Sequence, residues 1–286
     1  MRFIPFYSHF IAGNSLKHAL STQKKLQLKN VGTILDFAVE SPKKLSRNIN
    51  QIFSQINQSN SSFIALKLSS LNIHNHSNCL KLIDQFHQEN IKKKYPNKFL
   101  IDAENNDIQN TIYDVSNYAL DTYNTPSKKY FFKTIQMYRK DSISTLSTDI
   151  DYFMPKQKFA IKLVRGAYIK TDKQFICSSK EETDNQYNFA INELFSSLFY
   201  FPNNEIMFAT HNIDSYFQAL SYLKSHPYLI PNIHFATLLG MGDNICFDNS
   251  HFIQKYKYVP YGPFWETTPY LFRRLIENIE ILKHVS

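Results

Sequence analysis

The pattern of apolar positions along the chain predicts eight strands. Each predicted strand is a short apolar run, and most runs are continuous, which is typical of parallel strands covered on both faces. Neighbouring runs begin roughly 30 residues apart, the length that a strand, a crossover helix and two loops occupy. The chain therefore has the period of repeated βα units. The predicted strands are residues 31–37, 63–68, 99–103, 130–135, 159–164, 206–210, 233–239 and 256–260.

Between these runs, apolar residues recur at spacings of three and four and predict helices. Eight strands alternating with eight or more helices are what a (β/α)₈ TIM barrel requires, and an open, doubly wound sheet is the alternative. No composition break divides the chain, so residues 1–286 are expected to form a single domain, with an inserted loop at 169–188. The predicted helices are residues 14–29, 43–58, 77–94, 108–122, 138–152, 183–201, 215–225 and 268–284.

Composition excludes several classes of function. The chain has only six glycines, and Gly240-Met241-Gly242 lacks the third glycine of a dinucleotide fingerprint, so Rossmann and P-loop sites are excluded. Three widely separated cysteines indicate reduced thiols rather than a disulfide framework or a zinc cluster. The net charge of +8 comes from scattered residues, and the dense run 92–94 fits a solvated helix end, so no nucleic-acid partner is expected.

Polar side chains lie at or near the ends of six predicted strands, where a barrel of this kind keeps its chemistry. Taken singly, each has a simpler explanation as a half-exposed or hydrogen-bonded side chain. Together they imply a shared, charged cavity, because burying several charges is costly unless they pair or meet a ligand. Two or three cations beside one carboxylate suit an anionic small molecule. The residues are Lys67, Asp102, Gln136, Lys162, Arg165, His211 and Tyr258.

The last predicted helix carries Arg273 and Glu277 on one face, four residues apart. One interpretation is a surface salt bridge that contributes roughly 0.3 kcal/mol. The other is that Glu277 holds an arginine fork that grips a substrate carboxylate, a task that lysine performs less specifically. The helix alone leaves both interpretations open.

Five motifs, in order and with matching relative spacing, resemble the proline dehydrogenase family, the flavin-dependent enzymes of proline breakdown. The resemblance covers most of the chain and is most specific in its C-terminal run. It implies a distorted (β/α)₈ barrel whose C-terminal helix contributes to the active site. The motifs are Ile34–Ser41, Lys162–Tyr168, Phe208–Asn212, Leu239–Asp243, and Tyr258–Pro263 followed by Pro269–Arg274, Glu277 and Asn278.

The resemblance also implies a reaction and its partners. The family holds FAD at the carboxyl ends of the strands, oxidises L-proline to Δ1-pyrroline-5-carboxylate and passes electrons to a membrane quinone. For this chain it implies hydride transfer from proline, with its amine neutral, to the flavin, with no protein nucleophile and no metal. It further implies a mitochondrial location, on the matrix side, with peripheral contact to the inner membrane.

Roles for individual residues follow from the same resemblance. In the substrate site, cations would bind the proline carboxylate, acids would anchor those cations, and tyrosines would surround the pyrrolidine ring. The cations are Lys67, Arg273 and Arg274, the acids are Asp102 and Glu277, and the tyrosines around the ring are Tyr258 and Tyr270, while Tyr168 would support the pocket wall. The residues implied to bind FAD are Gln136, Lys162, Arg165, Gly166, Ala167, Thr210, His211 and Asn212.

The chain departs from the family pattern at three places. Lys162 stands where bacterial bifunctional members carry Arg, which preserves the charge and loses the fork geometry. Thr237 stands where related sequences commonly have Gln, so one polar contact is in doubt. Residues 1–30 contain no acidic residue, a bias shared with mitochondrial transit peptides, but they overlap barrel sequence and are expected to form a folded helix. The chain is then a compact form or lacks a leader.

Three other functions remain open. A hydroxyproline dehydrogenase is disfavoured by Tyr258, because a bulky ring beside the pyrrolidine leaves little room for a 4-hydroxyl group. A Schiff-base lyase could use Lys67 or Lys162 on the same barrel. A basic binding module without catalysis would have only salt-sensitive attraction for nucleic acid.

Overall fold

The computed structural model describes residues 4–169, 171–248, 250 and 252–272, with side chains from Tyr7 onward. Its eight strands are parallel and close into a barrel in which each strand pairs with its neighbours in sequence and β1 pairs with β8. The prediction of a closed (β/α)₈ barrel is therefore confirmed, and the open sheet is excluded. The strands are β1 (Gly32–Phe37), β2 (Phe63–Leu66), β3 (Lys98–Ile101), β4 (Phe131–Gln136), β5 (Ala160–Val164), β6 (Glu205–Ala209), β7 (Ile233–Leu238) and β8 (Gln254–Tyr261).

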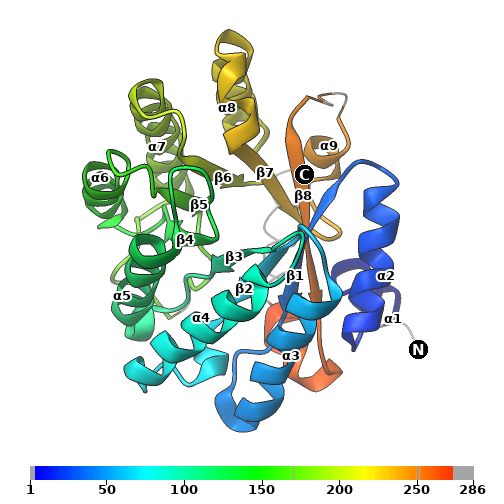
Figure 1. Cartoon of the computed structure of the whole chain (residues 1–286). Helices are drawn as coiled ribbons and strands as arrows, with labels where there is room; N and C mark the ends of the chain where they lie inside the picture. The colour runs from blue at the N-terminus through cyan, green and yellow to red at the C-terminus, as the bar shows by residue number, and fades with distance from the viewer. Residues whose placement is uncertain (1–3, 170, 249, 251, 273–286) are drawn as a thin grey trace.

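Helices surround the strands and follow one another around the barrel in chain order (Figure 1). The seven predicted helices that precede β8 are found, with ends shifted by up to four residues. The helices are α1 (Ile4–Phe10), α2 (Leu16–Gln27), α3 (Leu45–Gln58), α4 (His76–Ile91), α5 (Asn106–Tyr123), α6 (Ser142–Phe153), α7 (Lys180–Tyr200), α8 (Ile213–Ser225) and α9 (Asp243–Cys246). Short 3₁₀ turns form at η1 (Pro42–Lys44), η2 (Leu68–Leu71) and η3 (Pro227–Asn232).

Some boundaries differ from the sequence pattern for clear reasons. Helix α6 begins at Ser142 rather than at Tyr138, because Arg139 forms a bridge with Ile176 in the loop that follows β5. Residues 264–272 are helical, and the rest of the predicted helix 268–284 lies outside the described residues. The pattern does not predict α1 or α9. That residues 1–286 form a single domain stays a prediction.

The last crossover shows how the barrel is distorted. Between β7 and β8 the residues that the structure describes form one helix, the four-residue α9. Helix α2 packs against the outer face of β8, and the buried Lys257 of β8 holds the loop: its ammonium group contacts the carbonyl oxygens of Leu238 and Met241 and lies 2.7 Å from Asp243 Oδ1. A short polar loop therefore takes the place of a long crossover helix.

The barrel interior is filled by alternate residues of the strands, because successive side chains of a strand point to opposite faces. The inward residues form one buried cluster, and the outward residues pack against the helices in a larger one. Each fully buried large apolar side chain contributes about 2 kcal/mol of transfer free energy. The inward cluster comprises Ile34, Phe63, Ala65, Leu100, Phe132, Ala160, Met207, Ala236 and Tyr258.

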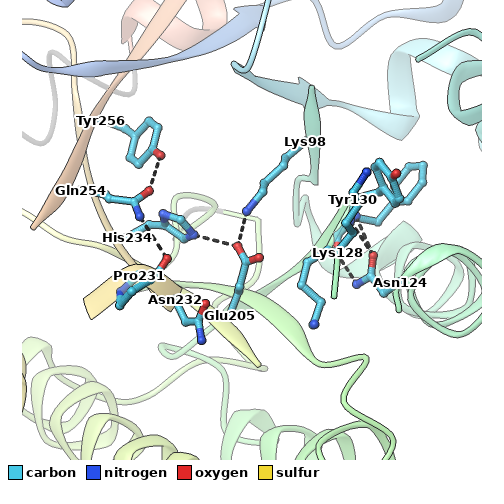
Figure 2. Close-up of polar contacts among 12 residues, drawn as sticks. Lys98, Asn124, Lys128, Tyr130, Glu205, Pro231, Asn232, His234, Gln254 and Tyr256 are labelled. Carbon is cyan, nitrogen blue, oxygen red and sulfur yellow. Dashed lines mark hydrogen bonds and ion pairs between the residues drawn. The ribbon is translucent and has the colours of Figure 1, made fainter. Parts of the chain in front are cut away.

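A polar network closes the floor of the barrel, where the strands begin (Figure 2). Glu205, the first residue of β6, accepts hydrogen bonds from Lys98 Nζ and, at 2.9 Å, from His234 Nε2. Burial opposes ionisation of Glu205, but His234 and Lys98 outweigh it and lower its pKa to about 2. Tyr256 packs edge-on against Phe63 beside this network, with ring centroids 5.0 Å apart. The charged groups at this end of the barrel are therefore paired with one another.

Candidate functional site

Five polar side chains from five strands meet inside the barrel near the opposite end, where the strands finish. Each continues the inward alternation of its strand: Asp36 lies two residues after Ile34, for example, and Lys162 two residues after Ala160. Four of the five belong to the predicted set. The five are Asp36 of β1, Lys67 just after β2, Asp102 just after β3, Lys162 of β5 and Tyr258 of β8.

Asp102 is the centre of this cluster. Its Oδ1 accepts hydrogen bonds from Lys162 Nζ and from the Tyr258 hydroxyl group, each at 2.5 Å. Its Oδ2 lies 3.1 Å from Lys67 Nζ. The ammonium group of Lys162 also lies 3.1 Å from the Tyr258 oxygen. One carboxylate, just after β3, therefore holds two lysines and a phenol that come from three other strands or strand ends.

Asp36 is the site residue that the sequence reasoning missed. Its Oδ1 lies 2.6 Å from Lys67 Nζ, and its side chain is 1% exposed. Asp36 belongs to a motif that resembles the family, but no role was assigned to it from the residues. The available signal was a lone carboxylate within the apolar run 31–37, which needs a partner if it is buried.

The predicted excess of positive charge in the cavity is wrong for the described residues. With Asp36 the cluster holds two carboxylates and two ammonium groups, and Arg165, predicted to add a third cation, points elsewhere. The physical reason is the cost of burial: an uncompensated ammonium group in the barrel would be far less stable than a paired one.

The charges of Asp102 and Lys67 support each other. Burial opposes ionisation of Asp102, but the ammonium groups of Lys162 and Lys67 outweigh it and lower its pKa to about 2. Burial likewise opposes the charge of Lys67, but Asp36 and Asp102 raise its pKa well above the usual lysine value. Both groups are therefore ionised at neutral pH, and the ion pair persists over a wide pH range.

In the other three members of the cluster, burial shifts the pKa in the direction that favours the neutral form. Burial raises the pKa of Asp36 despite Lys67, and lowers the pKa of Lys162 despite Asp102. Burial and the Asp102 carboxylate raise the pKa of Tyr258 well above its usual value. Tyr258 is thus a neutral hydrogen-bond donor that Asp102 holds in place.

Two more inward side chains of β4 carry polar atoms without partners. Gln136 Oε1 and Thr134 Oγ1 are buried and have no hydrogen-bond partner within the described part of the chain. Thr134 lies beside Lys162 in the strand register. A donor from a water molecule or a ligand would satisfy these two atoms.

A second network lies outside the central cluster and includes three predicted FAD-binding residues. Arg165 donates hydrogen bonds to Asp184, Thr210 and Ser215, and its guanidinium group stacks on the Tyr187 ring. Thr210 Oγ1 also accepts from the backbone N–H of Asn212. The guanidinium group links the end of β5 to α7 and α8 and so holds these three elements together.

Asn212 and His211 lie at the start of α8. The Asn212 side chain caps this helix by accepting from the backbone N–H groups of Asp214 and Ser215, both at 3.0 Å. His211 Nε2 accepts from the backbone N–H of Leu238 at 3.1 Å, which ties the end of β6 to the end of β7. These contacts fix the backbone that follows β6.

The segment after β5 has a glycine for a steric reason. Gly166 has a φ of +131°, and a Cβ at this position would lie 2.4 Å from the Tyr138 ring. Ala167 and Tyr168 follow it, both half-buried. The Tyr168 hydroxyl group donates to Glu40 at 3.4 Å, so this tyrosine spans from the β5 end to the segment after β1.

Glu104 lies beside the cluster and carries an unusual charge state. It is 3% exposed, and Ser69 donates to it from both its backbone N–H, at 2.9 Å, and its hydroxyl group. Burial raises the pKa of Glu104 to about 7 in spite of these hydrogen bonds. The carboxyl group is therefore half protonated near neutral pH.

The predicted contributions of the C-terminal helix are only partly visible. Tyr270 is buried among Phe10, Ile11, Ala38 and Met241, above the end of β1. Arg273, Arg274 and Glu277 lie outside the described residues.

Thr237 does not face the cluster. It alternates with the inward residues Ala236 and Leu238, and a Cβ on Gly242 would lie 2.8 Å from its methyl group. Its side chain therefore packs against the loop that precedes α9.

Comparison with known proteins gives a consistent result. A model of the proline dehydrogenase family matches residues 18–286. The chain is 32% identical to mitochondrial proline dehydrogenase 1 of Dictyostelium discoideum, over 63% of this chain and 34% of that one, and 30% identical to the human protein of the same name, over 65% and 33%. It spans about a third of the length of these relatives.

The fold comparison agrees with this match. Proline utilization A of Bdellovibrio bacteriovorus superposes with a TM-score of 0.81 at 19% identity, over 96% of this chain and 33% of that one. At that identity the superposition supports the barrel architecture alone. The family match over nearly the whole sequence decides the classification: the chain belongs to the proline dehydrogenase family.

Proposed function

We propose that the protein oxidises L-proline to Δ1-pyrroline-5-carboxylate with FAD as cofactor. The observation that carries this proposal is the cluster of Lys67, Asp102, Lys162 and Tyr258, which lies inside the barrel at the carboxyl ends of the strands. TIM-barrel enzymes place their active sites at this end. In a chain of the proline dehydrogenase family, such a cluster suits a small, charged amino acid.

In this proposal the substrate carboxylate binds to fixed cations. The Lys67 ammonium group is held by two acids, so it keeps its charge and direction when the substrate arrives. Arg273 and Arg274 complete the carboxylate site, with Glu277 as their anchor. Tyr258 presents its ring to the pyrrolidine, and Tyr270 and Tyr168 form the surrounding wall. Fixing the carboxylate in this way orients the ring carbon that loses the hydride.

FAD fits the unpartnered polar atoms of β4. Gln136 Oε1 and Thr134 Oγ1 are acceptors that lack donors, and the N–H of a flavin ring is a donor. Gln136 and Lys162 would hold the ring, and Arg165, Gly166, Ala167, Thr210, His211 and Asn212 would hold the remainder. When bound, FAD supplies the hydride acceptor, which no amino-acid side chain provides.

The remaining work falls to the chain's own residues. Lys162 places a cation beside the acceptor position, where it offsets the negative charge that arrives with the hydride. Asp102 holds that ammonium group at 2.5 Å and prevents its rotation. The polar floor at Glu205 and the apolar layer above it keep bulk water from entering through the far end. No protein nucleophile or metal takes part in the proposed reaction.

The proposal extends to partners and location. The electron acceptor is a quinone, reached by peripheral contact with the inner mitochondrial membrane, and no nucleic acid is bound. The mitochondrial relatives support the location. Among the helices of residues 4–272 that the structure describes, none has the length and apolar character needed to cross a bilayer.

A visible absorption spectrum tests the function directly. The purified protein should contain flavin that is not covalently attached and should show the flavin absorption spectrum. Addition of L-proline under anaerobic conditions should bleach this absorption. Protein that carries flavin but keeps its colour with proline would contradict the proposal. A larger kcat/KM for trans-4-hydroxy-L-proline than for L-proline would assign the hydroxyproline alternative instead, and borohydride trapping of substrate on Lys67 or Lys162 would indicate a lyase.

A further inference from the structure

Asp36 differs from Asp102, the other acid that contacts Lys67, in two respects. Its Oδ1 lies 2.6 Å from Lys67 Nζ, a shorter contact than the 3.1 Å between Lys67 and Asp102. Its Oδ2 is buried and accepts no hydrogen bond from any residue that the structure describes. The side chain is 1% exposed, so an acceptor without a donor is costly at this position. The second oxygen is therefore an acceptor in need of a ligand donor.

The two acids of the cluster differ in this respect. Asp102 has both oxygens in use, one by Lys162 and Tyr258 and the other by Lys67. Asp36 has one oxygen in use and one without a partner. Balanced charges also leave no net attraction for a simple anion in the described cluster. A ligand that carries both a carboxylate and an amine meets both needs at once.

The covalent geometry of an α-amino acid fits this arrangement. Its nitrogen and its carboxylate are attached to the same carbon, so the nitrogen lies within roughly 3 Å of the nearer carboxylate oxygen. A ligand whose carboxylate binds Lys67 therefore brings its N–H close to the acid that shares this lysine. Asp36 is the acid with a free oxygen.

We propose that Asp36 is a specificity-determining residue that accepts a hydrogen bond from the amine of the bound amino acid, through Oδ2. The proposal rests on the proposed function, because it assumes that Lys67 binds the carboxylate. In this role, Asp36 allows the site to distinguish an amino acid from a cyclic carboxylate that has no nitrogen. Lys67 alone would bind both ligands through the same group.

The test compares two ligands of similar shape in the flavin-loaded protein. L-Proline carries the amine, and cyclopentanecarboxylate lacks it. In Asp36→Asn, the KM for L-proline should rise roughly tenfold, because a neutral amide oxygen accepts a weaker hydrogen bond from the amine than a carboxylate does. The inhibition constant of cyclopentanecarboxylate, and its Kd by calorimetry, should stay constant or fall, because removal of a negative charge favours an anion.

A matched control separates this role from a structural one. Asp149 is a buried acid that pairs with Lys133 on the outer face of β4, at 2.7 Å. Asp149→Asn removes a comparable buried charge and should lower the Tm while leaving the affinities for both ligands unchanged. If Asp36→Asn folds poorly, Asp36→Ser removes the same charge with a smaller side chain.

Parallel loss of affinity for both ligands, or an unchanged KM for L-proline, would overturn the role of Asp36. Failure of the wild-type protein to oxidise L-proline would instead overturn the proposed function. The two failures are thus distinguishable.

Discussion

Asp102 and Lys162 lie 2.5 Å apart although β4 separates the strands that carry them. The contact crosses the barrel interior, where both side chains are almost completely buried. Removing one partner of such a pair leaves a charge without compensation in a place that water does not reach. This relationship makes the carboxylate at position 102 the most sensitive point of the cluster.

We predict that Asp102→Asn destabilises the protein by roughly 3 kcal/mol at pH 7, because it leaves Lys162 with no acid partner. The pKa of Asp102 is about 2, below its value of roughly 4 in an unfolded chain. Its contribution is therefore present above about pH 4 and lost as the pH falls toward 2. Urea denaturation at pH 7 and at pH 3 measures this. Asp151→Asn, at an exposed position of α6, is the control and should have little effect.

Lys162→Met should lower kcat for L-proline by roughly 10- to 100-fold, because a fixed cation beside the developing negative charge is lost. The midpoint potential of the bound flavin should also become more negative, since the reduced form loses a stabilising charge. Lys162→Arg keeps the charge and should recover part of both quantities. Equal potentials in the Met variant and the wild type would show that Lys162 acts only through packing.

The floor of the barrel should affect stability without affecting turnover. Glu205→Gln removes the acid shared by Lys98 and His234, and we expect a loss of roughly 2 kcal/mol, because Lys98 is one-third exposed and its pairing is partly screened. The pKa of Glu205 is about 2, so this stabilisation is present above about pH 4.5 and is lost as the pH falls toward 2. Denaturant titration gives the stability, and unchanged kcat and KM for L-proline would confirm that the two ends are independent.

Glu104→Gln should raise the stability of the protein above neutral pH, whereas Glu205→Gln should lower it. Burial raises the pKa of Glu104 to about 7, so the folded state holds a proton that the unfolded chain releases near pH 4.5. Stability therefore falls as the pH rises from about 4.5 to 7, and the variant should be more stable than the wild type by roughly 1–3 kcal/mol at pH 8. At pH 4 the two should be nearly equal. The exposed Glu193→Gln provides the control, and equal urea midpoints for Glu104→Gln and wild type at pH 8 would refute this prediction.

The strands were predictable because each buried strand is a continuous apolar run with a polar border. The short helix α9 was not predictable, because its four residues form no amphipathic repeat. Its position also depends on Lys257 of β8, whose ammonium group binds Met241 and Asp243 in the loop where α9 begins. The same limit applies to the start of α6, where the bridge between Arg139 and Ile176 depends on a loop that lies more than 30 residues later.

The site was predictable in part. The inward positions of Lys67, Asp102, Lys162 and Tyr258 follow from their places on apolar strands. The lone carboxylate of Asp36 in an apolar run signals a buried partner, but that this partner is Lys67 becomes evident only when β1 is placed beside β2. Arg165 alternates with the inward position 164, so the alternation itself places it on the outer face, where it binds Asp184 and α8; closeness to Lys162 in sequence was a misleading guide.

The pairing of β1 with β8 has a consequence for how the chain is made. Gly32 lies opposite Tyr256 and Phe37 opposite Tyr261, so the seam of the barrel joins segments from opposite ends of the sequence. During ribosomal synthesis β1 emerges long before its partner, and the nascent sheet keeps two open edges until β8 appears. Contacts between such distant segments form slowly. The barrel's own topology thus leaves these two edges unpaired until synthesis of the last strand.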